Sequence, residues 1–243
     1  MNPYEKALCD AYRMREGFGY RVVNDGNMTG IFWNDPRIQG LNSLFCPQIG
    51  AEEIERIRFW SRKLDGNLNI HCVVPVDPAY EDCFHFEEVS RLMMFEARQM
   101  LSGAPGYEIC EVRNEEELRS WCALAAEIFG MQKDEEALFA SLCPDFKIEK
   151  VHKYIGKAEG IPAAVAASSG GREACLIEWV GVLARFRRRG LCKAMLQNVI
   201  NHAFRNGYGR FVLSASAMGY PAYVESGFQV IRERYDYMWK GRK

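Results

Sequence analysis

The clearest hydrophobic pattern lies in the C-terminal third of the chain. Residues 175–182 are apolar except for Glu178, which predicts a largely buried strand that carries one carboxylate. In residues 191–204 the apolar positions recur at helical spacing, so a long amphipathic helix is expected after that strand. Asn206-Gly207 then provides a helix stop signal. The pattern therefore predicts a strand, a tight turn and a helix in succession.

The region around this unit also alternates between helix and strand patterns. Asn114 followed by three glutamates resembles a capping box at the start of a helix, and Gly130 is suited to end that helix. Turns are expected at Glu159-Gly160 and at Ser169-Gly170-Gly171. The remaining expected elements are a helix at 134–142 and strands near 151–157, 163–168, 211–215 and 234–240.

The first hundred residues give weaker signals. An amphipathic helix is expected at 52–64, a strand at 69–75 and a further apolar element at 92–95. Ser102-Gly103-Ala104-Pro105-Gly106 combines chain breakers with small residues and is the best candidate linker. We therefore expect a smaller N-terminal α/β unit at 1–101 and a larger unit at 107–243.

The turn before the long helix has the chemistry of an anion site. It reads Arg187-Arg188-Arg189-Gly190-Leu191-Cys192. The first N–H groups of a helix lack intrahelical partners, and with the helix dipole they favour a phosphate or pyrophosphate. The alternatives are a solvated basic face, together with Arg185 and Lys193, or a nucleic-acid patch. Only Phe186 is interleaved with these cations, which argues against nucleic acid.

Two motifs in this region resemble the GNAT superfamily of N-acetyltransferases. Arg187-x-x-Gly190-x-Cys192 is similar to the family's Q/R-x-x-G-x-G/A signature, which binds the pyrophosphate of acetyl-CoA. Ala222-Tyr223-Val224-Glu225-Ser226-Gly227-Phe228 is similar to its L-Y-x-x-x-G-F segment. The resemblance covers roughly residues 107–243. It implies a mixed α/β fold of the α+β type, with a strongly bent central sheet flanked by helices. The unit at 1–101 faintly resembles the degenerate half of two-lobed members.

The resemblance also implies where acetyl-CoA binds. The N–H groups of the segment Arg188, Arg189, Gly190, Leu191, Cys192 and Lys193, with Arg187 beside them, would hold the pyrophosphate. The pantetheine arm would follow the strand at Val180-Gly181-Val182, where a bulge presents N–H groups to the thioester oxygen. Gly181 would tolerate the backbone of such a bulge.

Two residues are candidates for proton transfer. In the family the tyrosine of the second motif often acts as general acid, so Tyr223 would protonate the CoA thiolate. The alternative is that Tyr223 only packs. Glu178 is the candidate base, because a lone carboxylate in an apolar strand should have a raised pKa. By a period of two it should share a strand face with Val180 and Val182. Its alternatives are an internal ion pair or a position facing solvent.

Three positions depart from the family pattern. Cys192 stands where Gly or Ala is preferred, Ser216 where many members carry Asn, and Ala184 where Pro is frequent. At a helix N-terminus beside arginines the pKa of the Cys192 thiol could fall. A covalent acetyl-cysteine intermediate is nevertheless disfavoured, because no histidine is placed by sequence to activate the thiol.

Composition narrows the class of protein. The 243 residues carry a net charge of −1, so the overall electrostatic potential of the protein does not favour binding to nucleic acid or to an acidic membrane. Nine cysteines without a CxxC pair favour free thiols in a reducing cytoplasm. The sequence contains no run of 18 apolar residues, so no membrane span is predicted. The four histidines are not at metal-site spacing from cysteines or carboxylates, so no metal is expected.

The sequence thus predicts a cytoplasmic N-acetyltransferase that moves an acetyl group from acetyl-CoA to a primary amine by direct attack in a ternary complex. The alternative is a non-catalytic acyl-CoA-binding or regulatory module. The acceptor, a small molecule or a peptide amine, is not determined; its surface is expected near Trp121, Phe129 and the first unit. The oligomeric state is open, a homodimer included.

Overall fold

A single open sheet of eleven strands runs through the computed structural model, which describes residues 2–33, 42–64, 68–104, 106–131, 133 and 135–240. The strands are β1 Tyr20–Asp25, β2 Met28–Trp33, β3 Ser43–Cys46, β4 Asn69–Cys72, β5 Phe84–Glu96, β6 Glu108–Glu111, β7 Val151–Ala158, β8 Ile161–Gly170, β9 Cys175–Val182, β10 Arg210–Ala215 and β11 Gln229–Trp239. The α-helices are α1 Pro3–Arg13, α2 Ala51–Lys63, α3 Glu115–Phe129, α4 Glu135–Leu142, α5 Leu191–Arg205 and α6 Tyr220–Glu225. The 3₁₀ helices are η1 Pro78–Cys83, η3 Cys143–Lys147 and η4 Ala184–Phe186. The mixed α/β fold with helices flanking one sheet is confirmed.

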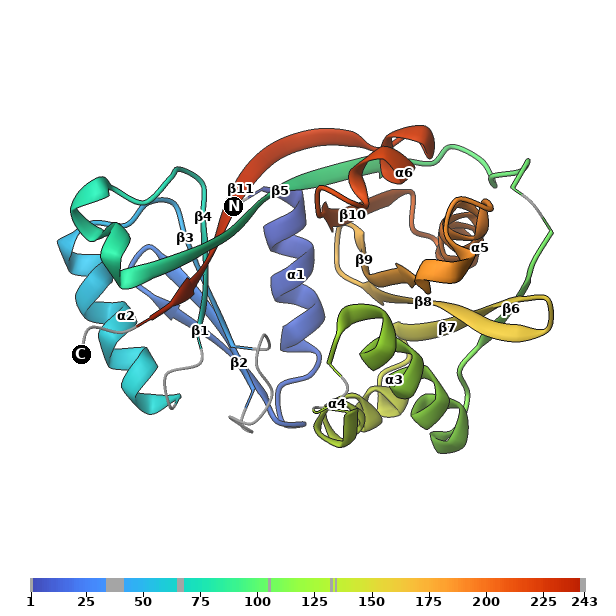
Figure 1. Cartoon of the computed structure of the whole chain (residues 1–243), viewed down its shortest axis with the longest axis horizontal. Coiled ribbons are helices and arrows are strands. Elements are labelled where there is room, and N and C mark those ends of the chain that lie inside the picture. Colours follow the sequence, from blue (N-terminus) through green and yellow to red (C-terminus); the bar gives the residue numbers. More distant parts are fainter. Residues whose placement is uncertain are drawn as a thin grey trace.

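The sheet joins two halves of the molecule through its longest strands. Its order is β1-β2-β3-β4-β11-β5-β10-β9-β8-β7-β6. In Figure 1, β5 and β11 cross the top of the molecule and connect the half that contains α2 to the half that contains α5. β11 pairs with β4 and β5, whereas β5 also pairs with β10. Strands from either side of the expected boundary at 101–107 are thus directly hydrogen-bonded, and the division into two units stays a prediction.

Each half contains a parallel strand–helix–strand unit. β3 and β4 are parallel and are connected by α2, and β9 and β10 are parallel and are connected by α5. Parallel neighbours need a crossover connection, and a helix is the usual one. This correspondence matches the interpretation of the first unit as a degenerate copy of the second, which stays an interpretation.

α1 lies at the centre of the molecule between the two halves (Figure 1). Its start is fixed locally, because Asn2 Oδ1 accepts from Glu5 N and Glu5 Oε2 accepts from Asn2 N. Its buried face, which includes Tyr4, Leu8 and Ala11, packs in one cluster with residues of β5, β9 and β10. The sequence analysis made no prediction for this helix, which is therefore an addition from the structure.

Most predicted elements of the second unit are found, with shifted ends. The strand at 175–182 and the helix that ends before Asn206-Gly207 are confirmed. The turn predicted at 169–171 is wrong in place: Ser169 and Gly170 belong to β8, and the chain reverses where Gly171 N donates to Ala174 O. Pro105 of the candidate linker and Asp134 of the predicted helix start lie outside the described residues.

The first unit differs more from its prediction. β4 ends at Cys72 rather than at residue 75, and the apolar element at 92–95 is only the end of the long strand β5. In the second unit, the closing strand β11 begins at Gln229, five residues before the predicted start. Both long strands carry many polar residues on exposed positions, so their patterns are not strongly apolar.

Within the described residues, no helix is both long and apolar enough to span a membrane.

A buried ionic cluster joins α1 to the second half. Asp145 Oδ1 accepts from Arg15 Nε at 2.8 Å, and its Oδ2 accepts from Lys153 Nζ at 2.5 Å. The three side chains are only 3–6% exposed. Burial alone would raise the pKa of Asp145, but the two adjacent cations lower it below its ordinary value. The cluster holds the end of α1 against η3 and β7.

We expect Asp145→Ala to destabilise the protein by about 3–5 kcal/mol, because it leaves two buried cations without a counter-charge. Equilibrium unfolding in urea measures this as a lower midpoint. The matched control is Glu136→Ala, which breaks an exposed ion pair with Arg119 and should change stability by less than about 1 kcal/mol. Equal midpoints for the two variants would contradict the structural role of the cluster.

Candidate functional site

The turn between β9 and α5 presents a row of unpaired backbone donors. η4 is followed by Arg188 with φ +60° and Gly190 with φ +84°, and the helix begins at Leu191. The first helical hydrogen bond runs from Ala194 N to Gly190 O at 3.0 Å. Within the described part of the chain, the N–H groups of residues 188–193 donate no hydrogen bond. The first turn of α5 also lacks acidic residues, so these donors are free to bind an anion.

In the other half, the start of the corresponding helix, α2, is occupied by a carboxylate of its own first turn. Glu53 Oε2 accepts from Gly50 N at 2.9 Å, and Glu53 Oε1 accepts from Asn27 Nδ2 at 2.9 Å. The Glu53 carboxylate therefore occupies the N-terminus of α2, where an anion would otherwise be attracted. Of the two strand–helix–strand units, only the one containing α5 presents an open helix start.

The arginine side chains of the turn are directed to different partners. Arg187 Nε donates to Val182 O at 2.9 Å, which holds the turn against the end of β9. Arg189 Nη1 is paired with Glu159 Oε1 at 2.9 Å, and Arg185 Nη1 lies 3.4 Å from Glu127 Oε1. Arg188 is exposed and has no ion-pair partner among the described residues. The backbone, rather than a cluster of guanidinium groups, provides the convergent donors.

β9 and β10 separate directly beside this turn. The two strands pair only at Cys175 with Phe211 and at Leu176 with Val212. From residue 177 onward, β9 is hydrogen-bonded only to β8, so its other backbone edge is open toward the gap between the strands. An extended polar chain can bind such an edge through main-chain hydrogen bonds.

A β-bulge interrupts β9 at the open edge. Val165 pairs with Gly181 and Ala167 with Glu178, and Trp179 between them has φ +55°. The bulge expected to depend on Gly181 is therefore centred on Trp179. Gly181 has a different reason to lack a side chain: a Cβ there would lie 2.5 Å from Ile128 Cγ2 at the end of α3. Gly181 permits close packing of α3 on the sheet.

The bulge also changes which face of the sheet Glu178 occupies. Val182 pairs with Ala164 and Glu178 with Ala167, and residues separated by an odd number point to opposite faces. The prediction that Glu178 shares a face with Val182 is therefore wrong. The predicted period of two does not hold across a bulge, which adds one residue to the strand.

Glu178 lies on the face covered by α1. Its Oε1 accepts a hydrogen bond from Tyr12 Oη at 3.4 Å. Burial raises the pKa of Glu178 above its ordinary value, and the nearby Arg15 cation opposes that rise. Among the described residues Glu178 has no ion-pair partner within 4 Å, so the alternative of an internal ion pair finds no support. The group retains proton affinity suited to a base.

Tyr223 lies at the opposite side of the gap, on α6. It is 6% exposed, and its ring packs edge-on against Phe228 at 6.0 Å between centroids. Gly219 leaves space for that ring, because a Cβ there would lie 2.9 Å from Tyr223 Cε2. The hydroxyl makes no hydrogen bond within the described part of the structure. Burial and the proximity of Cys192 raise the pKa of Tyr223, so its phenol is protonated at neutral pH.

The thiol of Cys192 does not have the character expected at a helix N-terminus. Burial raises its pKa to about 11, so the thiol is protonated at neutral pH. The prediction of a lowered pKa is wrong, because loss of solvent outweighs the favourable end of the helix dipole. All nine cysteines are free thiols, as expected.

The fold gathers the predicted residues around one gap in the sheet, but not all as side chains. The edge of β9 at residues 180–182 is not paired with β10, Tyr223 lies near Cys192 at the start of α5, and Glu178 is on the face under α1. Leu191 is buried in the core, so only its N–H group faces the turn. Trp121 is fully buried and cannot line an acceptor surface, whereas Phe129 is 42% exposed and can.

Tyr12 and Trp179 are the functional candidates that sequence reasoning missed. Tyr12 contacts a residue 166 positions away, and no local pattern signals that contact. Trp179 packs against Trp121 at 5.8 Å and Phe129 at 5.5 Å between ring centroids. The sequence shows that Trp179 follows Glu178 in a strand. It does not show that this bulky residue adopts a left-handed backbone conformation.

Comparison with known proteins places this geometry in a family. Residues 108–228 match the family model described as "Acetyltransferase (GNAT) family". Among solved structures, a GCN5-related N-acetyltransferase from Kribbella flavida is 17% identical with a TM-score of 0.68, over 99% of this chain and 98% of that one. A GCN5-related N-acetyltransferase from Sphaerobacter thermophilus is 15% identical with a TM-score of 0.62, over 99% and 94% of the two chains.

A third similar structure is a conserved protein of unknown function from Staphylococcus epidermidis, 12% identical with a TM-score of 0.70 over 93% and 96% of the two chains. Among curated proteins, no sequence matches the chain. At these identities the structural matches establish the fold of nearly the whole chain, including its first hundred residues.

We expect Gly190→Ala to weaken CoA binding at least tenfold, because a β-carbon at φ +84° strains the turn and reorients its N–H groups. The control is Gly207→Ala at the other end of α5, where φ is +89° and the strain is similar. Titration calorimetry measures both. Similar CoA affinities in the two variants would show that the turn does not hold the ligand.

Proposed function

Because this chain belongs to the GNAT family of acetyltransferases through residues 108–228, we propose that it transfers an acetyl group from acetyl-CoA to a primary amine. One observation carries the proposal: the open helix start at Gly190 follows β9, whose pairing with β10 stops after Leu176. A pyrophosphate on the turn would therefore place the pantetheine arm along β9 and its thioester in the gap.

The cofactor would be held mainly by backbone. The N–H groups of residues 188–193 would bind the pyrophosphate oxygens, and the open edge of β9 at Val180 to Val182 would bind the amides of the pantetheine arm. Exposed Arg188 and Lys193 would add positive charge near the phosphates.

The bulge would place a donor at the thioester oxygen. A bulged strand leaves its extra residue outside the ladder, so the N–H groups around Trp179 and Val180 would be available to the ligand rather than to β8. Negative charge forms on the carbonyl oxygen as the amine attacks. A preorganised donor at that position contributes about 3 kcal/mol of transition-state stabilisation.

The reaction would proceed by direct attack in a ternary complex. The amine nitrogen bonds to the carbonyl carbon, the carbon–sulfur bond breaks, and the sulfur leaves as a thiolate. Glu178 accepts the amine proton, through water if the amine does not reach it, because its raised pKa makes it a better base than a solvated carboxylate. The phenol of Tyr223 donates its proton to the thiolate sulfur, and solvent returns a proton to Tyr223.

Direct transfer is favoured over an acetyl-cysteine intermediate. Cys192 adjoins Tyr223, but burial raises the pKa of its thiol to about 11. A nucleophilic thiol needs a thiolate or an adjacent base, and no histidine contacts Cys192 among the described residues. The thiol instead acts as a small apolar filler behind the turn.

The acceptor would approach the face that carries Glu178, since the cofactor approaches from the turn. α1 covers part of this face through Tyr12, and the half-exposed Phe129 lies near Trp179 at its other border. These residues favour an amine with an adjoining apolar or aromatic group over a highly charged polyamine.

Acetyl-CoA binding followed by thiol release tests the proposal. Calorimetry should give binding to acetyl-CoA and CoA that weakens when phosphate is removed from the ligand. Release of free CoA with a panel of small and peptide amines, monitored with a thiol reagent, then tests transfer. Binding without thiol release with any amine would instead support a non-catalytic acyl-CoA-binding module.

We expect Tyr223→Phe to lower kcat about 100-fold with little change in acetyl-CoA affinity, because it removes the proton donor to the thiolate but keeps the ring. Steady-state kinetics and calorimetry measure the two effects separately. Tyr220→Phe on the same helix is the matched control and should retain activity, since Tyr220 contacts Arg91 rather than the gap. Full activity of Tyr223→Phe over a wide pH range would rule out the general-acid role.

We expect Glu178→Gln to lower kcat/KM about 100-fold near neutral pH and to remove an acid limb from the pH profile. The base acts only when ionised, so activity falls as pH drops through its raised pKa. Tyr12→Phe should keep activity but move that limb to higher pH, because the Tyr12 hydrogen bond stabilises the carboxylate. An acid limb that persists in Glu178→Gln would assign the base to another group.

A further inference from the structure

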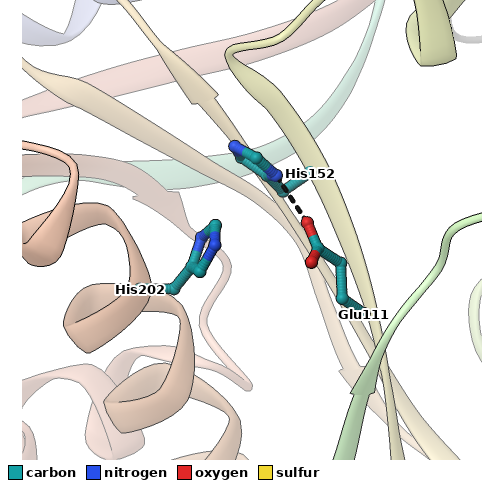
Figure 2. Close-up of side chains that lie close together, drawn as sticks. All are labelled: Glu111, His152 and His202. Carbon is teal, nitrogen blue, oxygen red and sulfur yellow. Dashed lines mark hydrogen bonds and ion pairs between the residues drawn. The ribbon is translucent and has the colours of Figure 1, made fainter.

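Three potential metal ligands converge at the far end of the second half. Glu111 ends β6, His152 lies near the start of β7, and His202 lies in the last turn of α5. One ligand atom from each lies within 4.8 Å of those of the other two. Figure 2 shows the three side chains directed toward one another from these elements. The residues are 41, 50 and 91 positions apart in the sequence, so no local spacing signals the group.

The contacts within the group already orient it. His152 Nδ1 and Glu111 Oε1 are 2.6 Å apart, and the rings of His152 and His202 lie 4.5 Å apart between centroids at an interplanar angle of 75°. Ligand atoms around a tetrahedral ion lie about 3.3 Å apart when metal–nitrogen distances are about 2.0–2.1 Å. Small side-chain rotations therefore suffice to bring all three atoms onto one ion.

Tyr154 provides the outer contact that metal-binding histidines usually have. His202 Nδ1 and Tyr154 Oη are 2.8 Å apart. When Nδ1 carries the proton and donates it to the hydroxyl oxygen, the lone pair of His202 Nε2 is left free for a metal. Tyr154 is itself buried, so this orientation is fixed by the core rather than by solvent.

We propose that Glu111, His152 and His202 form a binding site for a divalent transition metal of the zinc type. Two imidazoles and one carboxylate are a common donor set for Zn²⁺, and water completes the coordination. The side chains of Glu111 and His152 are about one-quarter exposed, at 25% and 23%, so an ion and its water ligand have access. The single carboxylate and two nitrogens disfavour Mg²⁺ and Ca²⁺, which select oxygen ligands.

The site is remote from the acetyl-transfer chemistry. His202 lies three turns along α5 from Leu191, about 17 Å from the anion-binding turn. The metal would connect the C-terminal end of α5 to β6 and β7, which are already paired with each other through their backbones. Its role is therefore to stabilise the packing of the cofactor-binding helix on the sheet, and stability would rise with the logarithm of free metal concentration once that concentration exceeds Kd.

The test uses the tag-free full-length protein with Zn²⁺ and Co²⁺ as probes. Equilibrium dialysis should give one Zn²⁺ per chain, and Zn²⁺ at about 100 times its Kd should raise Tm by about 5 °C or more. Co²⁺ should give visible d–d absorption without the thiolate charge-transfer band that cysteine ligands produce. That band distinguishes this site from the cysteine pair Cys46 and Cys72, whose sulfurs are 3.6 Å apart.

Glu111→Gln and His152→Gln should each lose the bound ion and the rise in Tm while keeping the fold, judged by circular dichroism. His85→Gln is the matched control, because His85 is exposed and paired only with Glu87. It should bind Zn²⁺ as the parent protein does. The absence of stoichiometric Zn²⁺ in the parent protein, or its retention in both site variants, would overturn the proposal.

Discussion

The separation of β9 from β10 is the constraint on which the site depends. Two parallel strands that stay paired along their length leave no main-chain groups for a ligand, and here the ladder ends after Leu176 and Val212. The bulge at Trp179 is part of the same feature, because the additional residue turns the backbone of β9 away from a regular ladder. α5 follows β9 after the short η4 and the arginine turn. In the proposed site, backbone donors from the strand and from the helix start bind one ligand.

The two halves of the sheet share one strand–helix–strand topology, but the starts of their helices differ. Both contain a parallel strand–helix–strand unit, yet the first turn of α5 carries no acidic residue, whereas that of α2 carries two. In α2 the Glu53 carboxylate caps the helix start by accepting from Gly50 N. Negative charge in its first turn thus makes α2 unfavourable for an anion, whereas the start of α5 fits the proposed phosphate site.

Parts of the first hundred residues pair with, and pack on, the half of the molecule that matches the acetyltransferase family model. β5 pairs with β10, β11 returns to pair with β4, and α1 covers the face that carries Glu178. The buried cluster of Arg15, Asp145 and Lys153 fixes the end of α1 at a small distance from that carboxylate. The N-terminal region therefore shapes both the acceptor side of the proposed site and the proton affinity of its proposed base.

The sequence by itself determined the strand–turn–helix unit at 175–205 and the resemblance to the family, because both depend on local periodicity and on motifs a few residues long. Only the tertiary structure decided the face of Glu178, its contact with Tyr12 and the convergence of Glu111, His152 and His202. A bulge shifts every later side chain of a strand without leaving a periodic signal. Contacts between residues 41 to 166 positions apart are set by sheet order and helix packing, which local patterns do not encode.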